Sequence, residues 1–182
     1  MKTFDELILV NYCYKDCIPL MNIMRLPQKE AFALAAQLAK KHPETTAFYR
    51  FADFENYYSL RKKQDEHLYS RFVELGGMPE EKHPLSFVIE GSDYLFDWFG
   101  KGIESRLRLR DILSCHISFT IGDSGAEYEK YGKVELLTAS DIKEQMLKNG
   151  NNFADFMQAT GKHYIEAQLW SDKYITEKYL II

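Results

Sequence analysis

One acidic side chain, Glu166, stands in a sequence setting that suits catalysis. It belongs to the run 163–170, whose alternation predicts a strand near the end of the chain. The core-facing positions of this strand are apolar: Ile165, Ala167 and Leu169. The opposite face carries a carboxylate among aromatic and amide side chains: Tyr164, Glu166, Gln168 and Trp170. Such neighbours can orient a carboxylate and shift its pKa, as catalytic carboxylates require.

Two other interpretations of this face stay open. A solvated carboxylate on an exposed sheet face is the simpler reading of Glu166. Two aromatic side chains on the same face instead indicate that a ligand or a protein partner covers it, because exposed apolar patches are commonly binding surfaces.

A cation for a phosphate-bearing ligand is offered by Arg50. It lies between aromatic residues in the run Thr46–Phe51, which predicts a short strand. The planar guanidinium group matches phosphate oxygens with two parallel hydrogen bonds. The alternative is a surface cation that packs its stem on its aromatic neighbours.

Charge and metal-binding residue types argue against several function classes. Lys and Arg number 23 against 27 Asp and Glu, a net charge of −4, so the chain as a whole is not drawn to nucleic acid. The row Arg106, Arg108 and Arg110 shares its face with Glu104 and is expected to be solvated, with a clamp for phosphate groups as the alternative. The five histidines lack metal-ligand spacing, and the three cysteines do not supply the four ligands of a structural zinc site.

Two short segments receive non-catalytic interpretations. Cys13 and Cys17 are expected to share one helix face as buried free thiols in a reducing compartment. Gly122–Gly125 follows a strand and is expected to be an ordinary tight turn. It lacks the lysine and the helix start of a phosphate-binding loop, although a small anion-binding nest remains the alternative.

The elements that must position these side chains follow from periodicity and capping signals. Helices are expected at 4–16, at 28–41, from a cap at Asp53 toward Leu75, at 93–99, from Thr138 to Gly150 and at 152–159. Strands are expected at 46–51, 85–90, 103–110, 116–121, 133–137 and 163–170. The polar stretch Arg61–Glu66 predicts that the third helix breaks there or bridges solvent.

This order of elements predicts an α+β fold in one domain, 1–182. A helical N-terminal part, 1–45, precedes a mixed body, 46–182, with a mostly antiparallel sheet and short flanking helices. With 182 residues, 46% of them hydrophobic and 27% charged, a disordered chain, a coiled coil and a collagen-like repeat are excluded. Neither a signal peptide nor an apolar run of membrane-spanning length is visible, so we expect a cytoplasmic protein.

Taken in chain order, residues 46–175 resemble the ADP-ribosyltransferase fold, especially its diverged bacterial, toxin-like members. In that family an early strand carries a basic residue that grips NAD, as Phe48-Tyr49-Arg50 would. A strand followed by a short aromatic helix shapes the nicotinamide pocket, and Leu85–Ile89 followed by Ser92–Trp98 is similar. A late strand presents the catalytic glutamate, as His163–Trp170 followed by Asp172–Ile175 would.

The resemblance implies an enzyme that uses NAD as co-substrate and substitutes at the ribose carbon that carries nicotinamide. Glu166 would hydrogen-bond a ribose hydroxyl and stabilise the oxocarbenium-like transition state. Arg50 would hold the phosphates, and Tyr94 or Trp98 would stack on nicotinamide. The chain departs from the arginine-modifying members at Tyr164, two residues before Glu166, where those members carry Gln or Glu. It also lacks a Ser-Thr-Ser triplet.

A non-catalytic interaction module, such as an immunity protein, antitoxin or adaptor, is the alternative function. Such a module would bind another protein through the aromatic-rich sheet face. The two hypotheses differ in one geometric expectation. Only the enzyme requires Arg50 and Glu166 to line one concave pocket with Tyr94 or Trp98 nearby.

Overall fold

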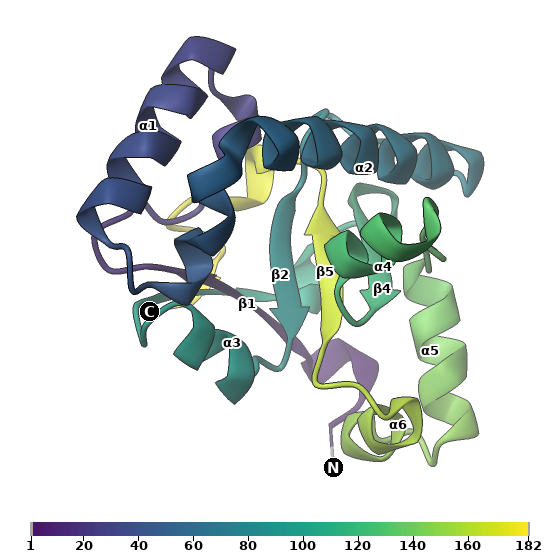
Figure 1. Ribbon diagram of the computed structural model, residues 1–182. Helices are drawn as coiled ribbons and strands as arrows, with labels where there is room; N and C mark the ends of the chain where they lie inside the picture. The colour runs from purple at the N-terminus through teal and green to yellow at the C-terminus, as the bar shows by residue number, and fades with distance from the viewer. Residues whose placement is uncertain (1, 182) are drawn as a thin grey trace.

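A computed structural model, which describes residues 2–181, has a six-stranded sheet flanked by helices (Figure 1). The strand order is β4-β5-β2-β1-β3-β6, and the paired strands are antiparallel. The strands are β1 (Ile8–Cys13), β2 (Leu85–Ile89), β3 (Ile103–Arg108), β4 (Ile117–Ile121), β5 (Ile165–Leu169) and β6 (Leu180–Ile181). The helices are α1 (Gln28–Lys41), α2 (Phe54–Glu74), α3 (Asp93–Trp98), α4 (Ser124–Tyr131), α5 (Ala139–Lys148) and α6 (Phe153–Thr160). The predicted α+β class is confirmed.

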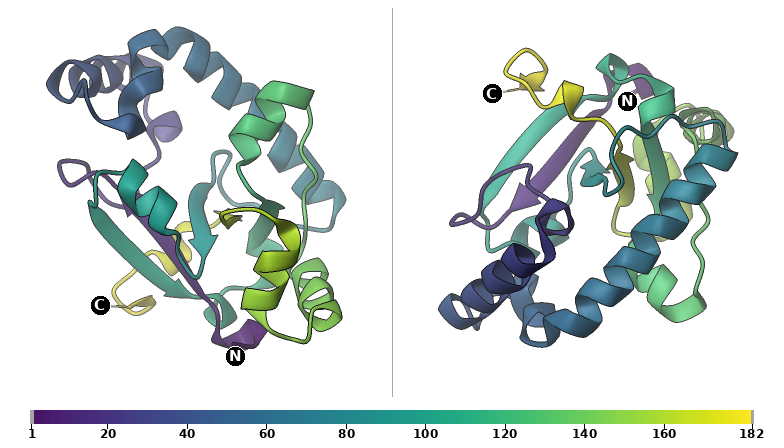
Figure 2. Two further views of the ribbon diagram at one scale, coloured as in Figure 1. Left: turned by 60° about the horizontal axis from the view of Figure 1, so that its bottom comes forward. Right: turned by 90° about the horizontal axis from the view of Figure 1, so that it is seen from above.

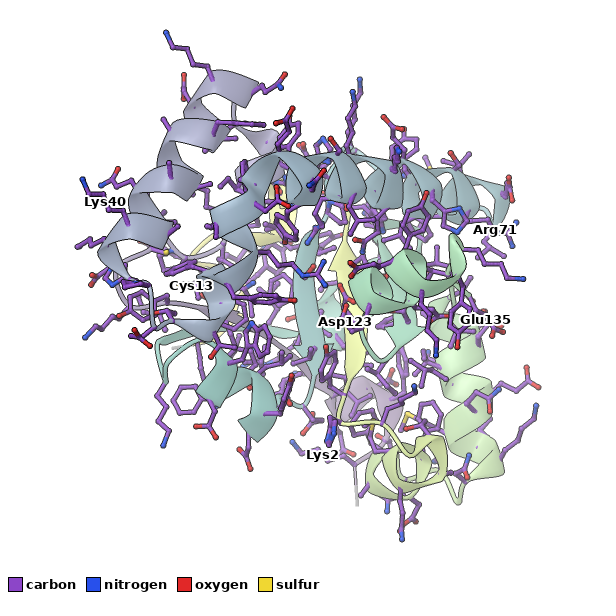
Figure 3. The ribbon with its side chains drawn as sticks, in the orientation of Figure 1. Lys2, Cys13, Lys40, Arg71, Asp123 and Glu135 are labelled. Atoms are coloured by element: carbon purple, nitrogen blue, oxygen red, sulfur yellow. The ribbon has the colours of Figure 1, made fainter. Side chains whose placement is uncertain are left out.

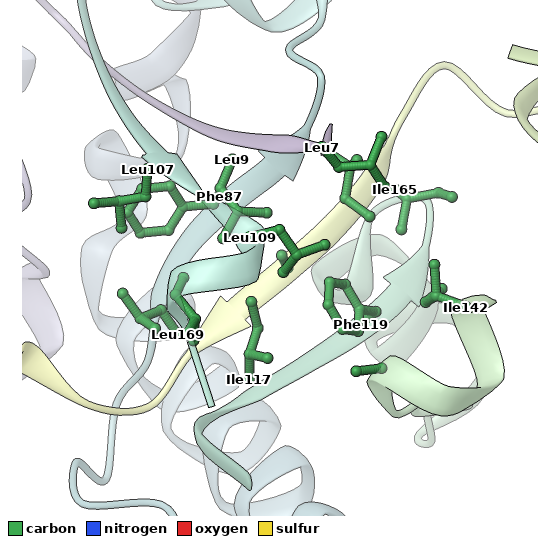
Figure 4. Packing of buried hydrophobic residues seen from close by; sticks show 14 of the residues in the cluster. Leu7, Leu9, Phe87, Leu107, Leu109, Ile117, Phe119, Ile142, Ile165 and Leu169 are labelled. Carbon is green, nitrogen blue, oxygen red and sulfur yellow. The ribbon is translucent and has the colours of Figure 1, made fainter. Parts of the chain in front are cut away.

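The main hydrophobic core lies between one face of the sheet and helices α5 and α6. Its members come from five strands and both helices, and Figure 4 shows how several of them interdigitate, among them Leu9, Phe87, Phe119, Ile142, Ile165 and Leu169. The predicted core face of β5 is confirmed, because Ile165, Ala167 and Leu169 are fully buried there. Alternation along the strand therefore turns Glu166 to the other face.

That other face carries a row of buried polar side chains where β4 and β5 pair. Trp170 Nε1 donates to Ser118 Oγ (2.8 Å), and Ser118 Oγ donates to Gln168 Oε1 (2.9 Å). Gln168 Nε2 in turn donates to Thr120 Oγ1 (3.1 Å). Helix α2 packs on Trp170, so this part of the face is covered from within the chain. The expectation that this face is exposed or covered by a partner is therefore wrong for Gln168 and Trp170, which are fully buried.

Helix α2 is continuous through the polar stretch Arg61–Glu66, where a break or a bridge across solvent was expected. In Figure 2 it passes over the sheet from α1 to α4, while α5 and α6 lie together away from α1. The helix stays unbroken because part of its polar stretch faces inward: Gln64 is 2% exposed and Asp65 is 1% exposed. Neither α2 nor another helix within residues 2–181 is long and apolar enough to cross a membrane.

The predicted helix at 4–16 is wrong. Only Phe4–Glu6 forms a 3-10 turn, capped as expected by Thr3 and Glu6, and the chain then enters β1. Because β1 lies inside the sheet, Leu9 and Val10 are buried on opposite faces, and such a continuous apolar run does not distinguish a strand from a helix.

This change of element also moves the two N-terminal cysteines. Cys13 ends β1 and Cys17 lies in the loop that follows, so they do not share a helix face. Both are half-buried free thiols, as is Cys115. Burial raises the pKa of Cys13 and of Cys17, which makes both thiols weak nucleophiles.

The predicted strand at 46–51 is also wrong, because Thr46–Asp53 forms a 3-10 helix, η3. Its aromatic side chains pack against a loop and a helix: Phe48 contacts the ring of Tyr14 in the loop after β1 (5.4 Å between centroids), and Phe51 contacts Phe54 at the start of α2 (5.3 Å). Aromatic residues favour strands mainly through packing, so neighbours in a loop or a helix can satisfy them equally well.

The remaining differences are small. The predicted strand 133–137 is reduced to one bridge between Leu137 and Phe119, while α4 and β6 were not expected. Helices α1, α3, α5 and α6 and strands β2 to β5 lie close to their predicted ranges. Ser92 and Thr138 cap α3 and α5 as expected.

Gly102 is expected to tolerate no side chain. A Cβ atom there would lie 2.1 Å from the carbonyl oxygen of Cys13 and 2.9 Å from the amide nitrogen of Lys15, both backbone atoms. We therefore expect Gly102→Ala to lower the free energy of unfolding by about 1–3 kcal/mol, the usual cost of overpacking. Urea denaturation measures this. The control Gly132→Asn, at an open position with φ of +67°, is expected to change stability by about 1 kcal/mol or less. Equal stability of Gly102→Ala and wild type would contradict the expected clash with the backbone of Cys13 and Lys15.

Candidate functional site

A cavity of about 480 Å³ opens on the polar face of the sheet. Its lining comes from β1 and the segment 14–23 that follows it, from β2 and β5, from α1, η3, α2 and α3, and from the start of α4. All four side chains singled out from the sequence belong to this lining: Arg50, Tyr94, Trp98 and Glu166. The volume falls within the range of small-molecule sites. The structure thus brings together residues that lie up to 116 positions apart in the chain.

Glu166 is held by the first residue of α4. Its Oε2 atom accepts a hydrogen bond from the backbone N–H of Ser124 (2.9 Å). Burial and the nearby Asp123 charge raise the pKa of Glu166 above its ordinary value. The hydrogen bond from Ser124 and the positive charge of Arg61 oppose this rise only in part. A sheltered carboxylate with a raised pKa is typical of a functional site.

Asp123 is a second carboxylate of the cavity, which the sequence analysis missed. Figure 3 labels it at the start of α4, beside β5. It caps this helix, because its Oδ1 accepts hydrogen bonds from the N–H groups of Gly125 (2.8 Å) and Ala126 (3.0 Å). The expected tight turn at 122–125 is therefore the beginning of a helix. An Asp before a helical acidic run is a start signal that the sequence carries.

Helix α2 supplies a second guanidinium group, that of Arg61. Its Nη2 lies 3.4 Å from Asp65 Oδ1, and its Nη1 lies 3.5 Å from the Tyr57 hydroxyl. Asp65 is also 2.7 Å from His83 Nδ1 through its other oxygen. Burial opposes the charge on Arg61, but Asp65, Tyr57 and Glu166 outweigh it and raise the pKa of Arg61. The cavity wall here carries a permanent positive charge.

Gln64, one turn further along α2, joins Arg61 in the cavity lining. Its Nε2 donates to Ser124 Oγ (2.9 Å), which links α2 to the support of Glu166. Sequence reasoning missed both Arg61 and Gln64, since a polar helical stretch usually faces solvent. Only the apolar residues that frame it, such as Phe54 and Leu68, indicate that this side of α2 is buried.

Arg50 lies on η3 and not on a strand. Its Nη2 is 2.6 Å from Glu129 Oε2, and its guanidinium carbon lies over the rings of Tyr49 and Tyr57 at 5.4 and 5.8 Å. Although burial opposes the charge, the Tyr49 hydroxyl and Glu129 raise the pKa of Arg50. Since Glu129 is half exposed, this ion pair is weak and leaves Arg50 free to exchange partners. Both interpretations of Arg50 from the sequence, ligand cation and aromatic packing, fit this position.

An aromatic wall closes the same side of the cavity. Tyr94 and Trp98 lie on α3, with their ring centroids 5.9 Å apart, and Tyr49 meets Trp98 edge to face at 5.7 Å. Tyr164, next to Glu166 along the chain, also lines the cavity. Burial, with the charges of Asp123 and Glu166, raises the pKa of the Tyr164 phenol, so the group stays protonated at neutral pH.

The arginine row considered from the sequence lies outside the cavity. Arg106 is ion-paired with Glu104, and Arg108 and Arg110 each lie 4.0 Å from Asp111. Within residues 2–181, no cluster of three or more His, Cys, Asp or Glu side chains is placed to hold a metal ion.

The cavity therefore combines two carboxylates, two guanidinium groups and a wall of aromatic rings. Such a set can hold a ligand that carries anionic groups, a flat ring and hydroxyl groups, and can stabilise positive charge that develops beside Glu166. Comparison of the chain with protein-family models, with curated proteins and with solved structures finds no match.

Proposed function

We propose that the protein is an enzyme that breaks the bond between ribose and nicotinamide in NAD or a close NAD-like nucleotide. The observation that carries the proposal is the position of Glu166, sheltered in a cavity that also holds two guanidinium groups and an aromatic wall. Each part of NAD has a counterpart in this lining. Arg50 suits the phosphates, Tyr94 and Trp98 suit flat rings, and Glu166 suits the ribose hydroxyls.

The proposed reaction is a substitution at the ribose carbon C1′. The bond from C1′ to the nicotinamide nitrogen breaks, and nicotinamide leaves as a neutral ring with the bonding electron pair. Water or an acceptor hydroxyl then bonds to C1′ and releases its proton to solvent. The ionised Glu166 carboxylate stabilises the positive charge on the sugar in the transition state, and a sheltered setting strengthens this interaction.

Nicotinamide release from NAD tests the proposal directly. We expect the purified chain at micromolar concentration to release nicotinamide from millimolar NAD, as measured by chromatography, with water as the default acceptor. We also expect NAD to raise the melting temperature, because a ligand that binds only the folded state stabilises it. If neither release nor a melting shift occurs at millimolar NAD, the proposal is wrong.

The pH dependence of this activity is expected to report on Glu166. Only the ionised carboxylate is active, so activity should fall as the pH decreases through the raised pKa of Glu166. Because Asp123 helps to raise that pKa, Asp123→Asn is expected to move the acid limb to lower pH, while Asn still caps α4. The control is Asp155→Asn, an exposed acid in the first turn of α6. An acid limb that stays in place, or moves upward, in Asp123→Asn would contradict this assignment.

The interaction-module hypothesis receives less support from the geometry. It relies on an aromatic-rich sheet face that is open to a partner, whereas Trp170 and Gln168 are fully buried beneath α2. Tyr164 and Glu166 are directed instead into the cavity.

A further inference from the structure

Two buried polar atoms on α2 have no hydrogen-bond partner among residues 2–181 and belong to side chains that line the cavity. They are Arg61 Nε, which carries a hydrogen, and Gln64 Oε1, which carries lone pairs. The two residues are three positions apart, so their side chains emerge from the same face of the helix. Gln64 is almost fully buried, and its free oxygen therefore cannot rely on bulk water.

The orientation of the Gln64 amide follows from its neighbours. Ser124 Oγ lies 2.9 Å from Gln64 Nε2 and accepts a hydrogen bond from it. Gln64 Oε1 is therefore the amide atom that has no partner among residues 2–181. Arg61 Nε and Gln64 Oε1 thus supply one unpartnered donor and one unpartnered acceptor on two side chains of the cavity lining.

A matching ligand group offers a carbonyl oxygen next to an N–H. We propose that Arg61 and Gln64 recognise a neutral carboxamide by hydrogen bonds, namely that of the nicotinamide group in the proposed NAD-like substrate. The carbonyl oxygen accepts from Arg61 Nε, and the amide N–H₂ donates to Gln64 Oε1. This inference deepens the proposed function and rests on it for the identity of the ring.

Charges in the cavity make Arg61 and Gln64 select against nicotinate, in which a carboxylate replaces the amide. A carboxylate has no hydrogen to donate and would place its negative charge against Gln64 Oε1, near Glu166 and Asp123. The positive charge of Arg61 is already engaged by Asp65. A site built to hydrogen-bond an N–H rejects an analogue that lacks it, since its own buried acceptor is then left unpaired.

The position of Arg61 and Gln64 also suits the proposed chemistry. Gln64, Ser124 and Glu166 form a continuous hydrogen-bonded chain from α2 through the start of α4 to β5. An amide held by Gln64 therefore lies close to the carboxylate that faces the breaking bond. Arg61 and Gln64 are positioning residues in this scheme.

The test is a pair of binding measurements by calorimetry or ligand-observed NMR, with nicotinamide and nicotinate as probes. We expect wild type to bind nicotinamide at least about tenfold more tightly than nicotinate. Gln64→Met keeps the approximate volume of the side chain but removes the Oε1 acceptor, together with the Nε2 donor to Ser124, and is expected to reduce this ratio to about threefold or less. Gln37→Met, an exposed glutamine on α1, should leave the ratio unchanged.

A second variant keeps the test informative if Gln64→Met does not fold. Arg61→Lys preserves the charge near Asp65 but removes the Nε donor, and is expected to weaken nicotinamide binding about fivefold or more with little effect on nicotinate. Arg71→Lys, near the exposed end of the same helix (Figure 3), is its control.

The outcomes separate this inference from the proposed function. Carboxamide recognition by Arg61 and Gln64 is wrong if wild type binds both probes equally, or if the nicotinamide preference survives both Gln64→Met and Arg61→Lys, even if NAD is cleaved. It is supported if the preference for nicotinamide depends on Gln64 or Arg61, even if NAD is not cleaved, in which case the proposed reaction alone is wrong. It is also wrong if nicotinamide does not bind at millimolar concentration.

Discussion

Glu166→Gln is expected to reduce nicotinamide release from NAD by about 100- to 1000-fold, the usual loss when one preorganised electrostatic group is removed from a transition state. Glutamine keeps the size of the side chain and can still accept the Ser124 N–H, so the change removes the negative charge and little else. The measurement is the rate of nicotinamide release at saturating NAD. Melting temperature with and without NAD should show that substrate still binds.

The stability of this variant has a definite sign. Because the folded-state pKa of Glu166 is raised, ionised Glu166 destabilises the fold at any pH above that pKa, and protonation relieves the cost as the pH falls. Glutamine is never charged, so Glu166→Gln should be at least as stable as wild type at pH 7, and this advantage should disappear in acid. A lost activity therefore cannot be attributed to unfolding.

The matched control is Glu135→Gln, an exposed acid that does not line the cavity (labelled in Figure 3). It should keep wild-type activity. If Glu166→Gln retained more than about a tenth of the wild-type rate, Glu166 would not be the group that stabilises the transition state.

The strand that carries Glu166 could be predicted because its alternation of apolar and polar residues is strict. Ile165, Ala167 and Leu169 mark the core face by strict alternation, and the structure buries all three. The same alternation gave the side of the sheet on which Glu166 lies. The alternation could not predict which segments cover that side of the sheet, because α2 and the start of α4 come from distant parts of the chain.

The polar side chains of α2 could not be assigned from the sequence for the same reason. Arg61, Gln64 and Asp65 are typical of a solvated helix face, and only the tertiary structure turns them toward a cavity. Asp123 was closer to being predictable, since it precedes a short run with the composition of a helix start. The strand β1 was mistaken for a helix because an interior strand has apolar residues on both faces.

Asp65→Ala is expected to lower the free energy of unfolding by about 3–5 kcal/mol, the largest stability change predicted for this chain. The Asp65 side chain is 1% exposed and is the partner of two groups, Arg61 Nη2 at 3.4 Å and His83 Nδ1 at 2.7 Å. Its removal leaves the guanidinium group of Arg61 in the cavity wall without its nearest counter-charge. Urea denaturation at pH 7 measures the loss.

The double variant Arg61→Met with Asp65→Leu tests whether the ion pair itself is needed for the fold. Replacement of Arg61 and Asp65 by apolar side chains removes both desolvation costs but leaves His83 Nδ1 without its partner. We therefore expect stability to recover to within about 1–2 kcal/mol of wild type, the remainder being the lost His83 contact. A double variant as unstable as Asp65→Ala would show that the pair stabilises the fold, and would contradict this expectation. Recovered stability together with lost binding of nicotinamide would mean that folding does not require the pair at this position. Asp65 would then serve to hold a charged, hydrogen-bond-donating side chain in the cavity wall, at a site where an apolar core would have been nearly as stable.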